Sequence, residues 1–244
     1  MEFHIALTGA LPALFAMWYF DRLDAKRPEP RSTLRKVTVF GALSVIPVVI
    51  MGAILLQFAP QAGTYARALY DSFVVAAGVE EMAKLLVVYW VVWGRPEFDE
   101  RMDGIVYATR AGLGFALVEN VLYLWSSADT TGFLVTFLMR ALLAVPGHAI
   151  WAGIMGYCAA KRRFDGIGPG LLGGYLIAVF LHGAYDAAIF LGPPFYRDGL
   201  VEISYALLIV LPIVIIGGAV ALRRMSRQAL YHDDIAERAV SRFS

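Results

Sequence analysis

The stretch AAGVEEMAKLLVVYWVV (residues 76–92) places Glu80, Glu81 and Lys84 among residues that are otherwise apolar, apart from one glycine. Its length approaches the roughly 20 residues that a helix needs to cross the hydrocarbon core of a bilayer. An ionisable side chain inside such a span is costly, so it is expected to face the interior of a helix bundle and to serve a function. The stretch therefore predicts both a membrane-spanning helix and part of a functional site.

The composition of the whole chain agrees with a membrane protein. Of 244 residues, 59% are hydrophobic and only 17% are charged, and the mean hydropathy is +0.63. This chain is too apolar for a soluble domain of its length, and we expect an all-α, polytopic helical bundle that contacts the lipid bilayer. Most Lys and Arg residues lie between apolar segments rather than on one surface, so no nucleic-acid partner is expected.

Several apolar segments are long enough to span the membrane. They predict about seven transmembrane helices within a single domain, residues 1–222. The segments are roughly 3–20, 37–59, 72–93, 104–127, 133–160, 169–192 and 201–222. The remaining residues, 223–244, are expected to form a cytoplasmic tail that is either a surface helix or disordered.

The loops between these segments predict the orientation. Basic residues are concentrated in 21–36, in KRRF (161–164) and in RRMSR (223–227), which fall on one side if the spans alternate. The positive-inside rule makes that side the cytoplasm, with the amino terminus outside and the carboxy terminus inside. We therefore expect a multi-pass protein of the cytoplasmic (inner) membrane. The loop GRPEFDERMD (94–103) is net acidic and does not follow this pattern; its Asp103 is expected to cap the next helix.

Polar groups on four predicted helices lie at similar depths. Counted from the outer end of each span, Glu80, Glu119, Arg140 and His182 lie roughly 10 to 15 Å into the membrane. His148 is deeper, but a kink at the preceding proline could bring its imidazole toward the others. These depths predict one shared site.

Spacing along each helix suggests how the groups pair. Lys84 follows Glu81 by three residues and Glu80 by four, so it can neutralise one carboxylate while the other stays reactive. In the same way, the carboxylate of Asp186 lies four residues after His182 and can fix its tautomer or add a ligand. Arg140 is expected to neutralise surplus carboxylate charge.

Two histidines and carboxylates from separate helices match the ligands that zinc prefers, with a position left for water. A spare glutamate could then act as a general base toward a peptide carbonyl. Three alternatives stay open: a metal-free reaction in which the histidines stabilise the oxyanion, a proton-coupled transporter that uses the same buried residues, and a non-catalytic membrane scaffold.

Four motifs together resemble the PrsW family of intramembrane proteases, which is related to the CAAX-processing endopeptidases. They are EEMAK (80–84), FALVEN (115–120), RALLAVPGH (140–148) and HGAYD (182–186), in the order that the family has.

The resemblance implies a bacterial site-one protease. Such an enzyme cleaves a single-pass membrane protein, for example an anti-sigma factor, on its extracytoplasmic side. On this basis the expected catalytic residues are Glu80, Glu81, Lys84 and Arg140, and the expected ligands of a Zn2+ ion are Glu119, His148, His182 and Asp186.

Overall fold

The computed structural model describes residues 2–241, which consist of helices and connecting loops without a strand. The predicted all-α fold is therefore confirmed. Met1 and residues 242–244 lie outside the described residues. The helices of the first half are α1 (Glu2–Leu23), α2 (Arg31–Leu43), α3 (Val45–Leu55), η1 (Leu56–Phe58), α4 (Tyr65–Tyr70), η2 (Asp71–Gly78) and α5 (Val79–Val91). Those of the second half are α6 (Arg101–Trp125), α7 (Thr130–Met139), η3 (Arg140–Ala144), α8 (Val145–Asp165), α9 (Gly170–Phe190), α10 (Gly192–Arg197), α11 (Val201–Leu207) and α12 (Val210–Val240).

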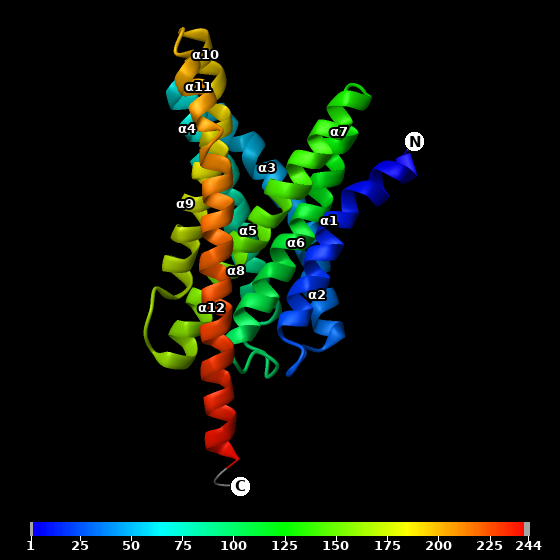
Figure 1. The fold of residues 1–244 in the computed structure, drawn as a ribbon, viewed down its shortest axis with the longest axis vertical. Coiled ribbons are helices and arrows are strands. Elements are labelled where there is room, and N and C mark those ends of the chain that lie inside the picture. The colour runs from blue at the N-terminus through cyan, green and yellow to red at the C-terminus, as the bar shows by residue number, and fades with distance from the viewer. Residues whose placement is uncertain (1, 242–244) are drawn as a thin grey trace.

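These elements join end to end into rods that match the predicted spans (Figure 1). Among the described residues, 5 rods are long and apolar enough to cross a membrane. They are Arg31–Phe58, Arg101–Trp125, Thr130–Asp165, Gly170–Arg197 and Val201–Ala239. The other two predicted spans correspond to α1 and to the rod α4–η2–α5, whose Arg67, Asp71 and EEMAK charges lower its apolarity.

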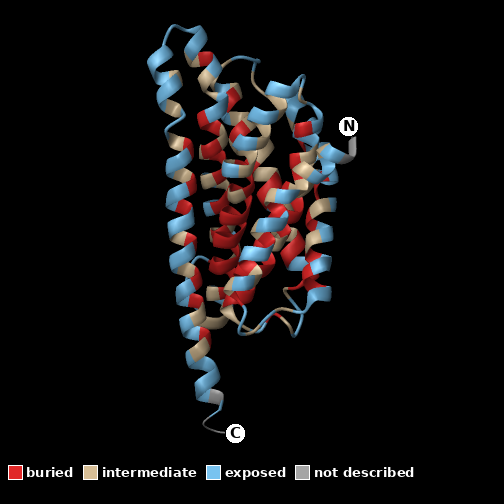
Figure 2. Cartoon of the chain, turned by 45° about the vertical axis from the view of Figure 1, so that its right-hand side comes forward, coloured by how far each residue is buried: buried red, intermediate tan, exposed pale blue. Residues whose placement is uncertain are grey.

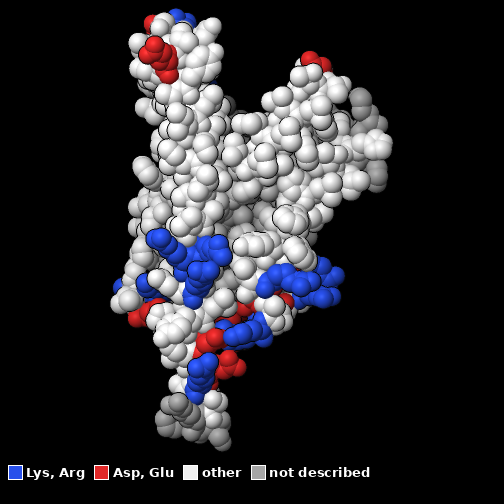
Figure 3. Space-filling model, in the orientation of Figure 1, with Lys and Arg blue, Asp and Glu red and all other residues white. Residues whose placement is uncertain are grey.

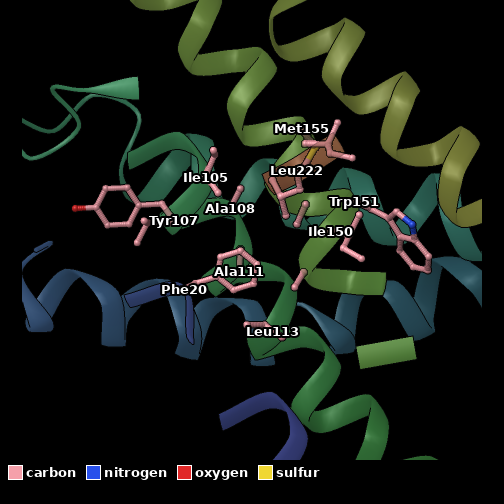
Figure 4. Packing of buried hydrophobic residues seen from close by; sticks show 14 of the residues in the cluster. Phe20, Ile105, Tyr107, Ala108, Ala111, Leu113, Ile150, Trp151, Met155 and Leu222 are labelled. Atoms are coloured by element: carbon pink, nitrogen blue, oxygen red, sulfur yellow. The ribbon is translucent and has the colours of Figure 1, made fainter. Parts of the chain in front are cut away.

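Helix α6 lies at the centre of the bundle. It packs against α1, α2 and α8, and 67% of its apolar window is buried, compared with 22% for the rods at Arg31–Phe58 and Val201–Ala239. Buried residues fill the interior in Figure 2, and Figure 4 shows Ile150 and Met155 of α8 in the same cluster as Ala108 and Ala111 of α6. This packing fixes the position of the two helices that carry Glu119 and His148.

Close helix contacts depend on glycine. A Cβ atom at Gly112 would lie 2.7 Å from the carbonyl oxygen of His148, and one at Gly114 would lie 2.2 Å from that of Thr38. The small residues before Glu119 thus allow α8 and α2 to approach α6.

Two segments of π-helix precede site residues. η2 ends immediately before α5, which begins at Val79, and η3 begins with Arg140 and leads into α8. A π-helical turn inserts an extra residue and rotates the side chains that follow it. The π segment Arg140–Ala144 lies immediately before Pro146, which is in the first turn of α8.

The two ends of the bundle differ in charge. Lys and Arg side chains gather at the lower end in Figure 3, near the carboxy terminus, and the upper end has few charges. Figure 1 shows the amino terminus toward the upper end, so the termini lie at opposite ends of the bundle. Of the two predicted states for the segment after residue 222, the structure shows a helix, because α12 continues without a break to Val240.

The start of α6 differs from expectation. The helix begins at Arg101, so Asp103 lies inside its first turn rather than at the cap. Its Oδ2 accepts hydrogen bonds from the backbone N–H groups of Asp99 and Glu100, both at 2.8 Å. The carboxylate still accepts from backbone N–H groups at the start of the helix, but these groups belong to residues that precede it in the chain.

Candidate active site

The polar residues singled out from the sequence meet in one cluster inside the bundle. Glu80, Glu81 and Lys84 come from α5, Glu119 from α6, Arg140 from η3, His148 from α8, and His182 and Asp186 from α9. Each helix contributes side chains that contact those of at least one neighbour, as the following distances show.

Lys84 lies at the centre of the cluster and is completely buried. Its Nζ donates to Glu81 Oε1 at 2.6 Å and to His148 Nδ1 at 2.8 Å, whereas Glu80 Oε2 is 3.5 Å away. Lys84 therefore neutralises Glu81 in preference to Glu80, which resolves the pairing that the spacing left open.

Glu119 contacts Arg140 and His148, two residues of the next rod. Its Oε2 lies 2.7 Å from Arg140 Nη2 and 2.8 Å from His148 Nε2. Arg140 is held in turn by Asn120, whose Oδ1 accepts from Arg140 Nε at 2.7 Å. With Lys84 donating to Nδ1 of His148, the ring carries its proton on Nε2 and donates to Glu119.

His182 has carboxylates on both sides of its ring. Nδ1 donates to Glu81 Oε1 at 2.9 Å, and Nε2 lies 3.4 Å from Asp186 Oδ2. A carboxylate on Nδ1 is the usual device that orients a histidine whose other nitrogen binds a metal. Glu81 therefore acts on His182 as an orienting group.

Glu80 makes longer polar contacts than Glu81. Its Oε2 lies 4.0 Å from His148 Nδ1 and 4.0 Å from His182 Nε2. The Glu80 side chain is 10% exposed, whereas that of Glu81 is 0% exposed. Of the two glutamates, Glu80 is the one that water can reach.

The residues fit a divalent metal ion. One ligand atom from each of Glu80, Glu119 and His148 lies within 4.8 Å of the others, and neutral imidazole with carboxylate oxygen is a donor set that zinc accepts. His182 Nε2 and Asp186 form a second pair beside Glu80.

Trp151 is a member of the site that sequence reasoning missed. Its ring stacks on His182, with centroids 4.2 Å apart and planes at 14°, and it also contacts the edge of His148. The Trp151 indole Nε1 is buried and has no hydrogen-bond partner among residues 2–241. Its position one helical turn after His148 was the available signal, but aromatic residues are too common in spans for that spacing to be diagnostic.

One cavity is separate from this cluster. It is an apolar groove of about 1020 Å³ between α2, α3, α5 and α9, lined by residues such as Phe40, Met82 and Tyr175. None of the charged site residues lines it, because they occupy the opposite side of α5.

The site is closer to the charge-poor end of the bundle. Glu119 and Asp186 lie in the last two turns of α6 and α9, and Arg140 begins η3 directly below α7. These three side chains are 17%, 14% and 11% exposed, respectively. Figure 3 shows the upper end divided by a notch between the arm that contains α7 and the column that contains α10 and α11. The least buried side of the site thus faces this end.

Comparisons with known proteins point to one family. The model of the PrsW family intramembrane metalloproteases matches residues 29–216. Three curated relatives carry the name Protease PrsW. The one from Geobacillus kaustophilus is 36% identical over 191 residues, which is 75% of this chain and 79% of that protein. The one from Oceanobacillus iheyensis is 33% identical over 226 residues, which is 91% of this chain and 95% of that protein. The one from Clostridioides difficile is 29% identical over 231 residues, which is 93% of this chain and 92% of that protein. No solved structure matches the chain.

Proposed function

Because the chain belongs to the PrsW family of intramembrane proteases, we propose that the cluster around Lys84 is its peptidase site and that Glu80 is the general base. The position of Glu80 carries this proposal. It lies between the two histidines and is partly exposed, whereas Glu81 is bound by both Lys84 and His182.

A zinc ion is the cofactor that the family description and the donor set favour. We assign Glu119, His148 and His182 as the residues that would hold it, with Asp186 beside His182. His148 would bind through Nε2, and the ion would replace the proton that Nε2 otherwise donates to Glu119. Such an ion would polarise the peptide carbonyl and make bound water more acidic.

The chain's own residues supply the proton transfers. Glu80 takes a proton from the attacking water as the water oxygen bonds to the peptide carbonyl carbon. As the C–N bond breaks, Glu80 returns that proton to the leaving nitrogen. Lys84 and Glu81 do not exchange protons in this scheme; they hold His148 and His182 in place. Arg140 holds Glu119 in the same way.

We infer that the substrate is a single-pass membrane protein, such as an anti-sigma factor, cut near the extracytoplasmic face of the inner membrane. The basic end of the bundle would lie in the cytoplasm by the positive-inside rule, which turns the charge-poor end and its nearby site outward. Substrates that are themselves membrane-embedded suit a site enclosed by spanning helices.

The proposal is tested by co-expressing the chain with a tagged single-pass anti-sigma factor and measuring the cleaved fraction. Glu80→Gln should reduce cleavage by about 10²- to 10⁴-fold while the protein remains folded. The matched control is Glu202→Gln, the same change at an exposed position outside the cluster, which should leave cleavage unchanged. Full cleavage by Glu80→Gln would remove Glu80 as the base.

The alternative of a proton-coupled transporter loses its support, because the family relationship identifies a peptidase. The same buried residues that could relay protons are explained by hydrolysis.

A further inference from the structure

A second cluster of carboxylates lies at the charge-rich end of the bundle, away from the residues assigned to catalysis. It brings together Asp24, from the turn after α1, with Glu100 and Asp103 at the start of α6. One oxygen from each residue lies within 4.8 Å of the others. The net-acidic loop at 94–103, which the orientation rule did not explain, supplies two of the three.

The carboxylates are buried but not satisfied. Asp24 is 2% exposed and Asp103 is 0% exposed. Both oxygens of Asp24 and Oε1 of Glu100 have no hydrogen-bond partner among the described residues, and Oδ1 of Asp103 has none apart from the neighbouring carboxyl group of Glu29. Buried carboxylate oxygens without a donor are strongly unfavourable, so a native structure normally gives them a proton, a water or a cation.

Nearby lysine and arginine side chains do not neutralise these carboxylate oxygens. Arg27 lies 2.5 Å from Glu100 Oε2, and its Nη1 is directed to Asp234 and Glu237, at 2.9 and 3.0 Å. Its Nη2 is buried without a hydrogen-bond partner among residues 2–241 and forms no ion pair with Asp24 or Asp103. Arg101 pairs with Asp165 and Asp233 instead. No lysine or arginine thus contacts the free oxygens of Asp24 and Asp103 within the part of the chain that the structure describes.

The electrostatics agree with the geometry. Burial, together with the charges of Glu100 and Asp103, raises the pKa of the Asp24 carboxyl to about 8. Burial and Asp103 similarly raise the pKa of Glu100 to about 7. Burial is the larger cause of both shifts, and the neighbouring carboxylates add to it.

We propose that Asp24, Glu100 and Asp103 form a second cation site, which binds one hard divalent cation of the Mg²⁺ or Ca²⁺ class. Oxygen-only ligands of this kind select such ions over zinc, and water molecules complete their coordination. Asp103 also accepts from the backbone of Asp99 and Glu100, so its second oxygen is already oriented toward the cluster.

The cation would join segments that are distant in the sequence. It connects the turn after α1 to the beginning of the central helix α6. The same helix start is bound by α12, because Asp233 accepts from the backbone N–H groups of Arg101 and Met102, at 3.1 and 3.0 Å. A bound ion therefore stabilises the charge-rich end against separation of α1 from α6.

The test uses the full-length protein in detergent after removal of metals with a chelator. Mg²⁺ and Ca²⁺ are titrated separately while thermal unfolding is followed, and bound Mn²⁺ is counted by electron paramagnetic resonance. At one hundred times the dissociation constant, the wild-type Tm should rise by about 5 °C or more. Asp24→Asn, which removes one like charge from the cluster, should fold without cations and show no such rise.

Two control proteins locate the ion. Asp99→Asn makes the same change at an exposed position of the same loop and should keep the full response. Glu80→Gln/His148→Ala, which alters the intramembrane cluster, should still bind one Mn²⁺ per chain and lose it when Asp24→Asn is added. A rise in Tm that persists in Asp24→Asn, or that disappears in Glu80→Gln/His148→Ala, would overturn the proposal. So would the absence of Mn²⁺ binding in Glu80→Gln/His148→Ala together with the absence of a Tm response to Mg²⁺ or Ca²⁺ in the wild type.

Discussion

The indole ring of Trp151 stacks on the imidazole of His182 at 4.2 Å between centroids and 14° between planes, so a helix α8 residue sets the ring plane of a helix α9 histidine. Glu81 holds the same imidazole through Nδ1. Ring plane and tautomer are thus controlled by different residues, and each can be altered without touching the other.

Removing the stack should impair cleavage more than it impairs folding. Trp151→Leu keeps an apolar side chain but frees the His182 ring, and a misplacement near 1 Å can cost about 10²-fold in rate. Trp151→Phe preserves an aromatic face and should retain most of the activity. Cleavage of a co-expressed substrate and thermal unfolding are measured for both variants; equal activity in Trp151→Leu and wild type would contradict a positioning role.

The buried ion pair should show strong coupling. Glu81→Gln or Lys84→Met alone leaves a buried charge with a weaker partner and should lower the free energy of unfolding by about 3–5 kcal/mol. The double variant Glu81→Gln/Lys84→Met should lose less than the sum of the two single changes, because each single change leaves the charge of the other partner behind and the double change removes both. Unfolding in detergent mixtures measures all three. The exposed pair Arg197–Asp198 is the comparison, and Asp198→Asn should leave stability close to that of the wild type. Strict additivity of the two single changes would mean that Lys84 and Glu81 are not paired.

Gly112 should not tolerate a larger side chain. Its Cβ in Gly112→Ala would lie 2.7 Å from the backbone carbonyl oxygen of His148, so α8 must shift, at a cost of about 1–3 kcal/mol. We expect reduced cleavage together with reduced thermal stability, since the shift moves His148. Gly217→Ala is the control: no atom lies within 4 Å of its Cβ, and the added helix propensity should leave the protein as stable or slightly more stable. An active, unshifted Gly112→Ala protein would show that α8 has more freedom than its packing indicates.

The zinc content of variants should distinguish the metal ligands His148 and His182 from the general base Glu80. Elemental mass spectrometry of purified protein should find about one zinc per chain in the wild type, and loss of that zinc in His148→Ala and in His182→Ala. Glu80→Gln should retain the metal while losing cleavage, because a base is not needed for binding. Loss of zinc in Glu80→Gln would make Glu80 a ligand, and an active wild-type protein without metal would favour water activated by glutamate alone.

The sequence alone was sufficient for the membrane-spanning bundle. Spans of about 20 apolar residues can satisfy their backbone in lipid only as helices, so length and hydropathy determine the fold class. The polar residues of the site could also be picked out, because an ionisable side chain inside a span stands out from its neighbours. Their membership of one cluster followed from comparing depths across four helices.

Contacts between helices required the tertiary structure. Spacing made both glutamates possible partners for Lys84, and only the arrangement of the side chains inside the bundle shows that Glu81 is the closer partner. Trp151 could not be distinguished from other aromatic residues until its stack with His182 was visible. The unsatisfied oxygens of Asp24 and Asp103 depend on the contact between the turn after α1 and the start of α6, which are far apart in the sequence. Hydropathy is a property of each segment by itself, whereas pairing, stacking and burial of single atoms depend on how the segments rotate and pack against one another.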